Sequence, residues 1–251
     1  MSWEDIKKIL MTRFPVEEVE PVPGTRLTKT RRLTTEVHAE WLYSLACNLS
    51  NDAWICEIGT LYGFLTAMFG FSCQTTNRRV VTIDHMIGSH CMDMRSRDKC
   101  IYLEFIDNMI SLGIWDKIIP FPMKSFSYFG IPDFGDTIIP EIEINNRYFQ
   151  AFEMLLLMKA EFELIYIDGN HSYSNVSEEL KRYSELLKPG GLICGDDCNA
   201  YGHSFLKSFL FDQKNFEDVP AVAQAMLKFF NGNNNFEPID VPIGQFGFRK
   251  V

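Results

Sequence analysis

Residues 162–197 read FELIYIDGNHSYSNVSEELKRYSELLKPGGLICGDD, and this stretch contains the pattern of a strand, a helix and a second strand. The apolar run Leu164–Ile167 is typical of a buried parallel strand. Apolar residues at three- and four-residue steps then predict a helix with one buried face over residues 176–187. The sequence KPGG at 188–191 predicts the end of that helix, and residues 192–195 predict the second strand.

Both predicted strands end in acidic residues. Asp168 follows the first strand, and Asp196 and Asp197 follow the second. A right-handed crossover makes the two strands parallel, so the three carboxylates are expected at the same edge of one sheet. Ligands of open α/β sheets bind at this carboxyl edge. We therefore predict a functional site there.

A second strand, loop and helix precede this stretch. Residues 53–58 (AWICEI) predict a strand, and the glycine loop 59–63 (GTLYG) leads into a helix that begins near Phe64. Residues 79–84 (RVVTID) predict the next strand, which ends in Asp84. Glycines let a ligand approach the backbone at a helix N-terminus. An acid at the end of the next strand is placed to bind two ribose hydroxyls, so the pattern predicts a nucleoside-binding site.

The remaining elements are predicted from periodicity and from turn residues. Residues 1–33 are expected to form an N-terminal arm outside the core, and residues 34–251 one domain in which 125–147 is a lid or a substrate loop. Further helices are predicted at 34–51, 101–112, 148–159 and 219–230, and further strands at 118–121 and in a hairpin at 236–250.

Composition limits the class of protein. A chain of 251 residues fits one α/β domain with extra elements, or one domain and a small subdomain. The net charge of −9 argues against nucleic acid or an anionic membrane as a partner and favours a small substrate. Seven cysteines without a CxxC pair predict reduced thiols. With no long apolar run visible, we expect a cytoplasmic protein.

The stretches EIGTLYGFLT, VVTID and IDGNHSY with LLKPGGLICGDD together resemble the motifs of class I S-adenosylmethionine-dependent methyltransferases. More narrowly, they resemble the branch of macrocin and sugar O-methyltransferases known as methyltransferase family 24. The resemblance covers roughly residues 36–230. It implies a Rossmann-like, doubly wound α/β fold with a mostly parallel seven-stranded sheet and an antiparallel C-terminal hairpin strand. It also implies S-adenosylmethionine as methyl donor and a small hydroxylated metabolite, a sugar or glycoside, as acceptor.

The resemblance assigns roles to individual residues. Three acidic positions match the magnesium ligands of metal-dependent members: Asp168, Asp196 and Asp197. Ten positions match residues that bind the cofactor at its methionine, ribose or adenine end: Glu57, Gly59, Thr60, Tyr62, Gly63, Asp84, His85, Lys124, Ser125 and Asp168. Within this set Asp84 is expected to hold the ribose, and Lys124 and Ser125 to lie near the adenine.

The acidic cluster also favours a metal on physical grounds. Three crowded carboxylates repel one another, and a hard cation such as Mg²⁺ relieves this repulsion. The cation would also lower the pKa of a bound acceptor hydroxyl. The alternative interpretation is that Asp168 only ends its strand and that Asp196 and Asp197 cap a following turn.

The catalytic residues expected from the sequence are His171 and Asp168. Many members of the resembled branch carry an acid where this chain has Asn170. His171 is the expected replacement, because a neutral imidazole accepts a hydroxyl proton near pH 7. The alternative is that His171 only positions the neighbouring carboxylates.

Other classes of protein remain as alternatives. A nicotinamide-dependent dehydrogenase is disfavoured, because no GxGxxG follows the first strand and no tyrosine precedes a lysine by four residues. A non-catalytic cofactor-binding protein is favoured only by Asn170. Nucleic-acid methylation fits poorly with the acidic composition. The proline-rich N-terminal segment favours a homo-oligomer.

Overall fold

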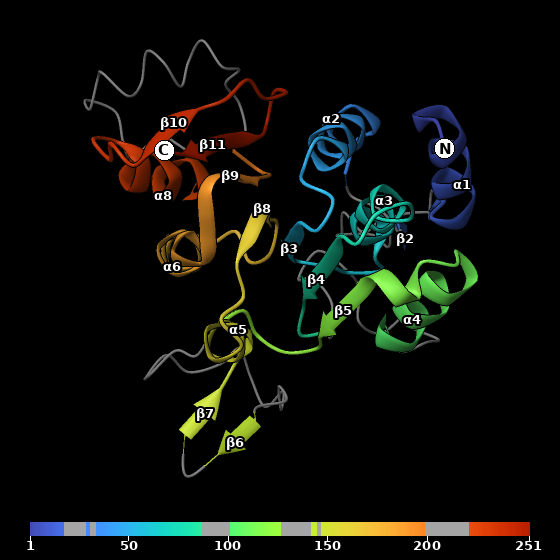
Figure 1. Cartoon of the computed structure of the whole chain (residues 1–251), viewed down its shortest axis with the longest axis horizontal. Coiled ribbons are helices and arrows are strands. Elements are labelled where there is room, and N and C mark those ends of the chain that lie inside the picture. Colours follow the sequence, from blue (N-terminus) through green and yellow to red (C-terminus); the bar gives the residue numbers. More distant parts are fainter. Residues whose placement is uncertain (18–28, 31–33, 87–100, 127–141, 145–146, 199–220) are drawn as a thin grey trace, which may run out of the picture.

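The computed structural model of the chain describes residues 1–17, 29–30, 34–86, 101–126, 142–144, 147–198 and 221–251. Its centre is a seven-stranded sheet with the strand order β10-β11-β9-β8-β3-β4-β5 (Figure 1). The strands are β3 (Trp54–Ile58), β4 (Arg79–Ile83), β5 (Ile118–Phe121), β8 (Phe162–Ile167), β9 (Leu187–Gly195), β10 (Phe236–Pro238) and β11 (Phe246–Lys250).

The sheet is parallel from β5 to β9, and β11 is antiparallel to both of its neighbours. This arrangement confirms the predicted α/β fold, including its antiparallel C-terminal strand. The order of the strands reverses between β3 and β8. Ligands bind to open α/β sheets at such a switch point, beyond the carboxyl ends of the strands.

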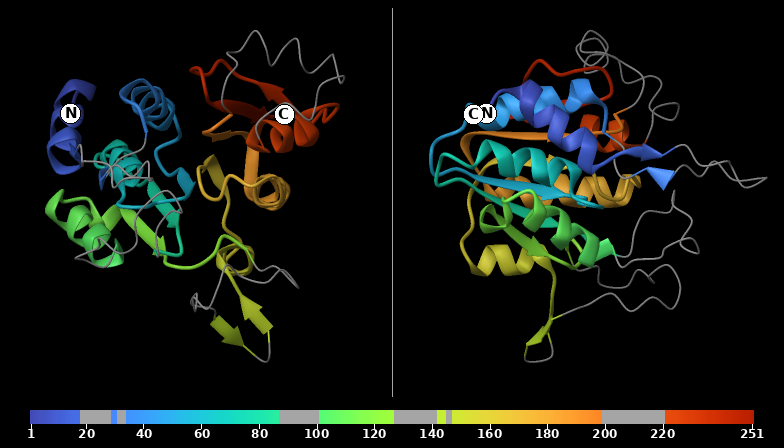
Figure 2. Two further views of the ribbon diagram at one scale, coloured as in Figure 1. Left: turned by 180° about the vertical axis from the view of Figure 1, so that it is seen from behind. Right: turned by 90° about the vertical axis from the view of Figure 1, so that its right-hand side faces the viewer.

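Helices cover both faces of the sheet (Figures 1 and 2). One face carries α1 (Trp3–Arg13), α2 (Glu36–Cys47), α3 (Phe64–Ser72) and α4 (Ile101–Ser111), and the other carries α5 (Ala151–Leu157), α6 (Tyr173–Tyr183) and α8 (Ala221–Phe230). Successive side chains of a strand point to opposite faces. In β8, Leu164 and Tyr166 accordingly belong to the core beneath α1–α4, whereas Ile165 and Ile167 belong to the core beneath α5, α6 and α8.

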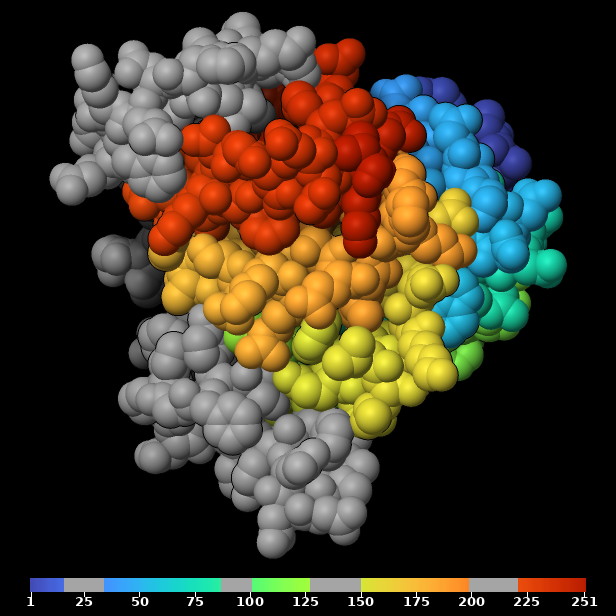
Figure 3. All heavy atoms as spheres, turned by 60° about the vertical axis from the view of Figure 1, so that its left-hand side comes forward, coloured from blue at the N-terminus to red at the C-terminus, as the bar shows by residue number. Residues whose placement is uncertain are grey.

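Shorter elements complete the described chain. Two small antiparallel pairs and two 3-10 turns are present: β1 (Val16–Glu17) with β2 (Lys29–Thr30), β6 (Ile142–Ile144) with β7 (Arg147–Phe149), Trp115–Lys117 and Ser184–Leu186. In the space-filling view the C-terminal elements in red lie directly on the orange segment that contains α6 (Figure 3). No helix in the described part of the chain is long and apolar enough to cross a membrane.

The start of the chain differs from the sequence expectation. Helix α1 covers the domain, as expected of an arm, but Ile6, Leu10 and Phe14 are fully buried and belong to the core cluster shared with α2 and α3. The expectation that this segment lies outside the core is therefore wrong for α1. Its buried residues Ile6, Leu10 and Phe14 recur every four positions, but the stretch is short and is followed by several prolines, which favoured the interpretation as an arm. The division of the chain at residue 33 stays a prediction.

Two further expectations have mixed outcomes. The helix ends before the KPGG sequence at 188–191, as predicted, but the second strand begins earlier than the predicted residue 192, because β9 starts at Leu187 and runs through this sequence, with Gly190 at φ 77°. The predicted lid at 125–147 lies mostly outside the described residues.

Backbone hydrogen bonds extend the sheet by one residue beyond its strands. The amide of Gly59 donates to the carbonyl of Ile83 at 2.9 Å, and the amide of Asp168 donates to the carbonyl of Ile58 at 2.8 Å. The amide of Asp196 donates to the carbonyl of Ile167 at 3.2 Å. The glycine loop and the acidic residues therefore start from neighbouring positions along one edge.

Arg78 fixes the entry into β4. Its buried guanidinium donates to four backbone carbonyls, those of Cys47, Leu49, Ser50 and Ser72. These carbonyls lie at the end of α2, in the loop after it and at the end of α3. One side chain thus ties two helices to the sheet.

We predict that Arg78→Met lowers the free energy of unfolding by about 2–4 kcal/mol, because it removes a buried guanidinium and with it the donor to four backbone carbonyls. The matched control is Arg79→Met, whose guanidinium is half-buried and donates to the carbonyl of Arg78 at 3.3 Å. The control is expected to change the free energy by less than about 1 kcal/mol. Urea unfolding of the three proteins measures both values, and equal losses in the two variants would contradict the role of Arg78.

Candidate active site

The glycine loop after β3 is held by the acid that follows β4. Oδ2 of Asp84 accepts hydrogen bonds from the backbone amides of Thr60 at 3.0 Å and Leu61 at 2.8 Å, and Oδ1 accepts one from the amide of Met86 at 2.7 Å. Asp84 therefore shapes the loop, a role that the sequence did not reveal. A carboxylate offers further lone pairs. The predicted contact with a ribose stays a prediction.

Both loop glycines are needed for the backbone they form. Gly59 has φ 96°, and a Cβ there would lie 2.0 Å from the carbonyl oxygen of Asp168. Gly63 has φ 89°, and a Cβ there would lie 2.7 Å from the side chains of Phe105 and Met109. Residues with side chains rarely adopt such positive φ values. The structure thus brings the glycine loop into direct contact with the turn that carries Asp168.

Glu57 lies beneath the loop and is fully buried. Its Oε2 accepts hydrogen bonds from Thr66 and, at 2.6 Å, from Thr82, while Oε1 finds no partner among the described residues. Burial raises the pKa of Glu57 to about 8, although the two hydroxyl donors act in the opposite direction. One oxygen of this carboxyl group remains available to a donor.

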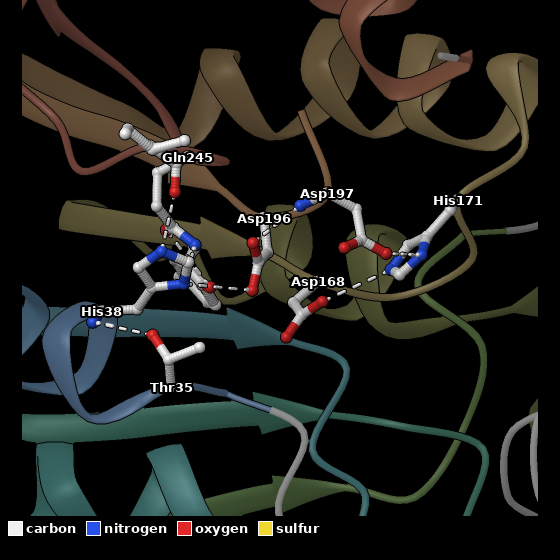
Figure 4. A network of polar contacts seen from close by, with 9 residues as sticks. Thr35, His38, Asp168, His171, Asp196, Asp197 and Gln245 are labelled. Carbon is white, nitrogen blue, oxygen red and sulfur yellow. Dashed lines mark hydrogen bonds and ion pairs between the residues drawn. The ribbon is translucent and has the colours of Figure 1, made fainter. Parts of the chain in front are cut away.

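His171 lies between two of the three acids (Figure 4). Its Nδ1 is 2.6 Å from Oδ2 of Asp197, and its Nε2 is 3.3 Å from Oδ1 of Asp168. The hydrogen bonds to Asp168 and then to Asp197 raise the pKa of His171 to about 10. Burial raises the pKa of Asp168 to about 6, although His171 acts in the opposite direction. At neutral pH the ring is then a cation, and this arrangement does not support its predicted role as a base.

Asp196 and Asp197 turn to different sides. Asp197 has φ 53°, an unusual value that aspartate tolerates better than most residues, and it reaches His171. Oδ1 of Asp196 accepts the backbone amide of Asp197 at 2.7 Å. Its Oδ2 lies 3.8 Å from Nδ1 of His38, a residue of α2. Figure 4 shows the two histidines on opposite sides of the acids.

This arrangement does not fit the predicted magnesium site. The described residues contain no group of three or more His, Cys, Asp or Glu side chains that could hold a metal ion. The three acids are present at one edge, but the ring of His171 joins Asp168 to Asp197 and Asp196 points toward His38. The imidazolium of His171 provides the positive charge that the crowded carboxylates require.

The other predicted cofactor residues lie around the same edge with their polar groups engaged. The hydroxyl of Thr60 bonds that of Thr82, and the carbonyl of Tyr62 accepts Nδ2 of Asn108 at 2.9 Å. Nδ1 of His85 lies 3.6 Å from Oδ1 of Asp84. The amide of Lys124 donates to Gln150 at 3.0 Å, and the hydroxyl of Ser125 donates to Oε1 of Glu179 at 2.6 Å.

Sequence reasoning missed His38, Gln245 and Glu179. Glu179 is buried and appears in the sequence as one of several charges on an amphipathic helix. Oε1 of Glu179 would lie 3.6 Å from a Cβ at Gly169, so it sits under the turn after Asp168. His38 meets partners more than 200 residues away. Contacts between residues so far apart in the sequence leave no local pattern from which they could be predicted.

We predict that Glu57→Gln makes stability less dependent on pH. Between about pH 4.5 and 8 the folded protein keeps a proton on Glu57 that the unfolded chain has released. The free energy of unfolding should therefore fall as pH rises through this window. Glutamine cannot ionise, so the fall between pH 5 and pH 8.5 should be smaller by about 1–3 kcal/mol in the variant.

Urea unfolding at the two pH values measures this effect. The control is Glu185→Gln at an exposed position, which should leave the wild-type pH dependence unchanged. Equal slopes for wild type and Glu57→Gln would show that Glu57 is not protonated in the fold.

Known structures share this architecture at low sequence identity. The O-methyltransferase TomG from Streptomyces achromogenes, in complex with S-adenosylmethionine, is 16% identical over 86% of this chain and 79% of that chain, with a TM-score of 0.50. The TDP-rhamnose 3'-O-methyltransferase CalS11 is 13% identical over 84% and 76%, with a TM-score of 0.50. A putative rRNA methylase from Clostridium thermocellum is 12% identical over 87% and 100%, with a TM-score of 0.52. These likenesses show the fold, which hosts different acceptors.

A search among curated proteins finds no match. The sequence profile of methyltransferase family 24, described as a methyltransferase domain, matches residues 56–198, which is more than half of the chain. This segment contains the glycine loop, Asp84, the His171 cluster and both of the acids after β9. The chain therefore belongs to the methyltransferase domain family, among the class I S-adenosylmethionine-dependent methyltransferases.

Proposed function

We propose that the protein transfers the methyl group of S-adenosylmethionine to a hydroxyl of a small hydroxylated metabolite, a sugar or a glycoside. The observation that carries this proposal is the contact between Gly59 and the turn of Asp168 at the switch point of the sheet. It puts a nucleoside-type glycine loop directly beside a cluster of acids and an imidazole. Donor and acceptor would then meet at one edge.

The donor half of the site is the glycine loop. Helix α3 begins at Phe64, directly after the loop, and its N-cap Gly63 offers no side chain to its first amides. Asp84 holds the loop in shape through Thr60 and Leu61. Oε1 of Glu57, which has no partner within the part of the chain that the structure describes, suits a donor such as the ammonium group of the methionine end. These features favour binding of S-adenosylmethionine with its nucleoside toward Asp84.

The acceptor half is the Asp168–His171 pair. In the transfer step the acceptor oxygen forms a bond to the methyl carbon while the carbon–sulfur bond breaks, and the sulfur keeps the electron pair. The hydroxyl proton passes to Asp168, whose pKa of about 6 leaves it ionised at neutral pH. The cationic ring of His171 stabilises the negative charge on the oxygen. Alignment of the methyl donor with the acceptor hydroxyl lowers the activation free energy further.

A small hydroxylated acceptor fits the charge of the chain better than a nucleic acid does. The net charge of −9 opposes a polyanion, and three of the chain's carboxylates, those of Asp168, Asp196 and Asp197, lie at the edge where the acceptor would bind. Carboxylates accept hydrogen bonds from hydroxyl groups. The similarity of the fold to that of the TDP-rhamnose 3'-O-methyltransferase CalS11 supports a sugar as the proposed acceptor.

We predict that wild-type protein binds S-adenosylmethionine in calorimetry and that Asp84→Ala weakens binding at least tenfold. The variant loses the carboxylate that orders the loop, and hydrogen bonds to charged groups contribute about 1.5–3 kcal/mol. The control is Asp116→Ala, whose side chain is 72% exposed and lies away from the loop. Circular dichroism confirms that each variant is folded.

Absence of binding by wild-type protein would defeat the proposed function. The acceptor class is tested separately by release of S-adenosylhomocysteine with TDP-rhamnose, simple glycosides, catechol and RNA as probes. We expect release with the hydroxylated small molecules and none with RNA. Release with RNA alone would replace the proposed acceptor by a nucleic acid.

Magnesium assistance, implied by the sequence resemblance, finds no support in the arrangement of the described residues. We predict that EDTA leaves turnover within about twofold of that in Mg²⁺, because His171 already provides the local positive charge. Calorimetric titration of Mg²⁺ into the protein with bound S-adenosylhomocysteine gives an independent readout, and no saturable binding is expected. Activity that EDTA abolishes and Mg²⁺ restores would contradict the metal-free site.

A further inference from the structure

His38 contributes to the acceptor side of the site, although it lies more than 100 residues before Asp168 in the sequence. It lies in the first turn of α2, where its amide donates to the N-cap hydroxyl of Thr35 at 3.3 Å. Its ring reaches the turn before β11 and the acid that follows β9, as Figure 4 shows. The proposed transfer chemistry above does not use this residue.

The ring of His38 is held at both nitrogens. Nε2 lies 2.8 Å from the carbonyl oxygen of Ile243, and Nδ1 lies 3.0 Å from Nε2 of Gln245. A carbonyl oxygen only accepts, so Nε2 carries a hydrogen and donates it. The ring therefore has one fixed orientation, with its Nδ1 edge turned toward Asp196.

The side chain of Gln245 is itself held in place by Tyr166. It is 1% exposed, and its Oε1 is 3.4 Å from the hydroxyl of Tyr166, which is fully buried in β8. The amide of Cys198 donates to the carbonyl of Gly244 at 2.9 Å, which joins the segment after Asp197 to the same turn. Helix α2, the 242–245 turn and the end of β9 thus meet at His38.

Asp196 is the acid that this network leaves open to a ligand. Its Oδ1 is used by the backbone amide of Asp197, while its Oδ2 faces Nδ1 of His38 at 3.8 Å, beyond direct hydrogen-bond length. The side chains of His38 and Asp196 keep 14% and 16% exposure, so both reach the surface of the edge. By contrast, Asp168 and Asp197 are both engaged by His171.

We propose that His38 is a positioning residue of the acceptor site. Held by Ile243 and Gln245, its ring lies against Oδ2 of Asp196 and donates no hydrogen bond to it, because Nδ1 accepts from Gln245; the ring limits the carboxylate by contact and leaves it on the acceptor side, apart from the group formed by Asp168, His171 and Asp197. Asp196 then accepts a hydrogen bond from a second hydroxyl of the acceptor while the reacting hydroxyl lies beside Asp168. This inference rests on the proposed function and adds a preference for acceptors with neighbouring hydroxyl groups.

The contact between His38 and Asp196 is tested in the absence of S-adenosylmethionine and of a methyl acceptor. The measurement is NMR of the full chain with ¹⁵N-labelled histidine rings. The chain has five histidines, and His38→Phe assigns the His38 signals by their loss. We expect Asp196→Asn to shift the ring signals of His38, whereas Asp197→Asn shifts those of His171 and leaves His38 in place. An unchanged His38 in Asp196→Asn would overturn the proposal, whatever the fate of the proposed function.

The role in positioning is tested by kinetics with the acceptor that gives the highest release of S-adenosylhomocysteine. His38→Phe keeps the volume of the ring but loses both nitrogens, and we expect its acceptor KM to rise about tenfold while its calorimetric affinity for S-adenosylmethionine stays unchanged. His38→Gln keeps an N–H donor and should recover part of the loss.

Thr35→Ala is the structural control. It removes the N-cap of α2 and should lower the melting temperature without raising the acceptor KM. An acceptor KM in His38→Phe equal to that of wild type, or one that rises as much in Thr35→Ala, would show that His38 serves only to pack α2.

Discussion

The backbone contact between the ends of β3 and β8 is the constraint on which the site depends. The carbonyl of Ile58 accepts the amide of Asp168, and Gly59 then passes so close to the carbonyl of Asp168 that a side chain has no room. Because both strands are parallel members of one sheet, their ends are held at the spacing of neighbouring strands. The distance between the glycine loop and the turn of Asp168 is therefore fixed by the main chain.

The distribution of charge around this contact follows from burial. Carboxyl groups at a sheet edge lose water, and each responds in its own way: Glu57 favours its protonated form, whereas Asp168 and Asp197 share the ring of His171. Asp84 differs, since three backbone amides supply its hydrogen bonds. A donor with a positively charged sulfonium would bind between Asp84 on one side and the His171 group on the other.

The sequence predicted the parts of the fold that arise from local pattern. Apolar runs predicted β3 and β4 to within one residue and β8 to within two, and the terminal acids marked the edge where they meet. It failed where the outcome depends on contacts between distant segments. The metal prediction rested on three acids in the sequence, and no local pattern shows that Asp196 lies 3.8 Å from His38 or that Asp197, at φ 53°, reaches His171. The burial of α1 likewise depends on its packing against α3, and the local sequence of α1 does not predict that contact.

Helix α1 has a practical consequence for handling the protein. Its Phe14 packs edge-on against Phe64 at a centroid distance of 5.7 Å, and Trp3 packs near Tyr43 at 5.5 Å. A shortened chain that starts at the domain boundary drawn from the sequence would leave these aromatic surfaces of α2 and α3 open to water. Exposed apolar patches of this kind promote self-association. Truncation would then produce oligomers that reflect the missing helix rather than the native assembly.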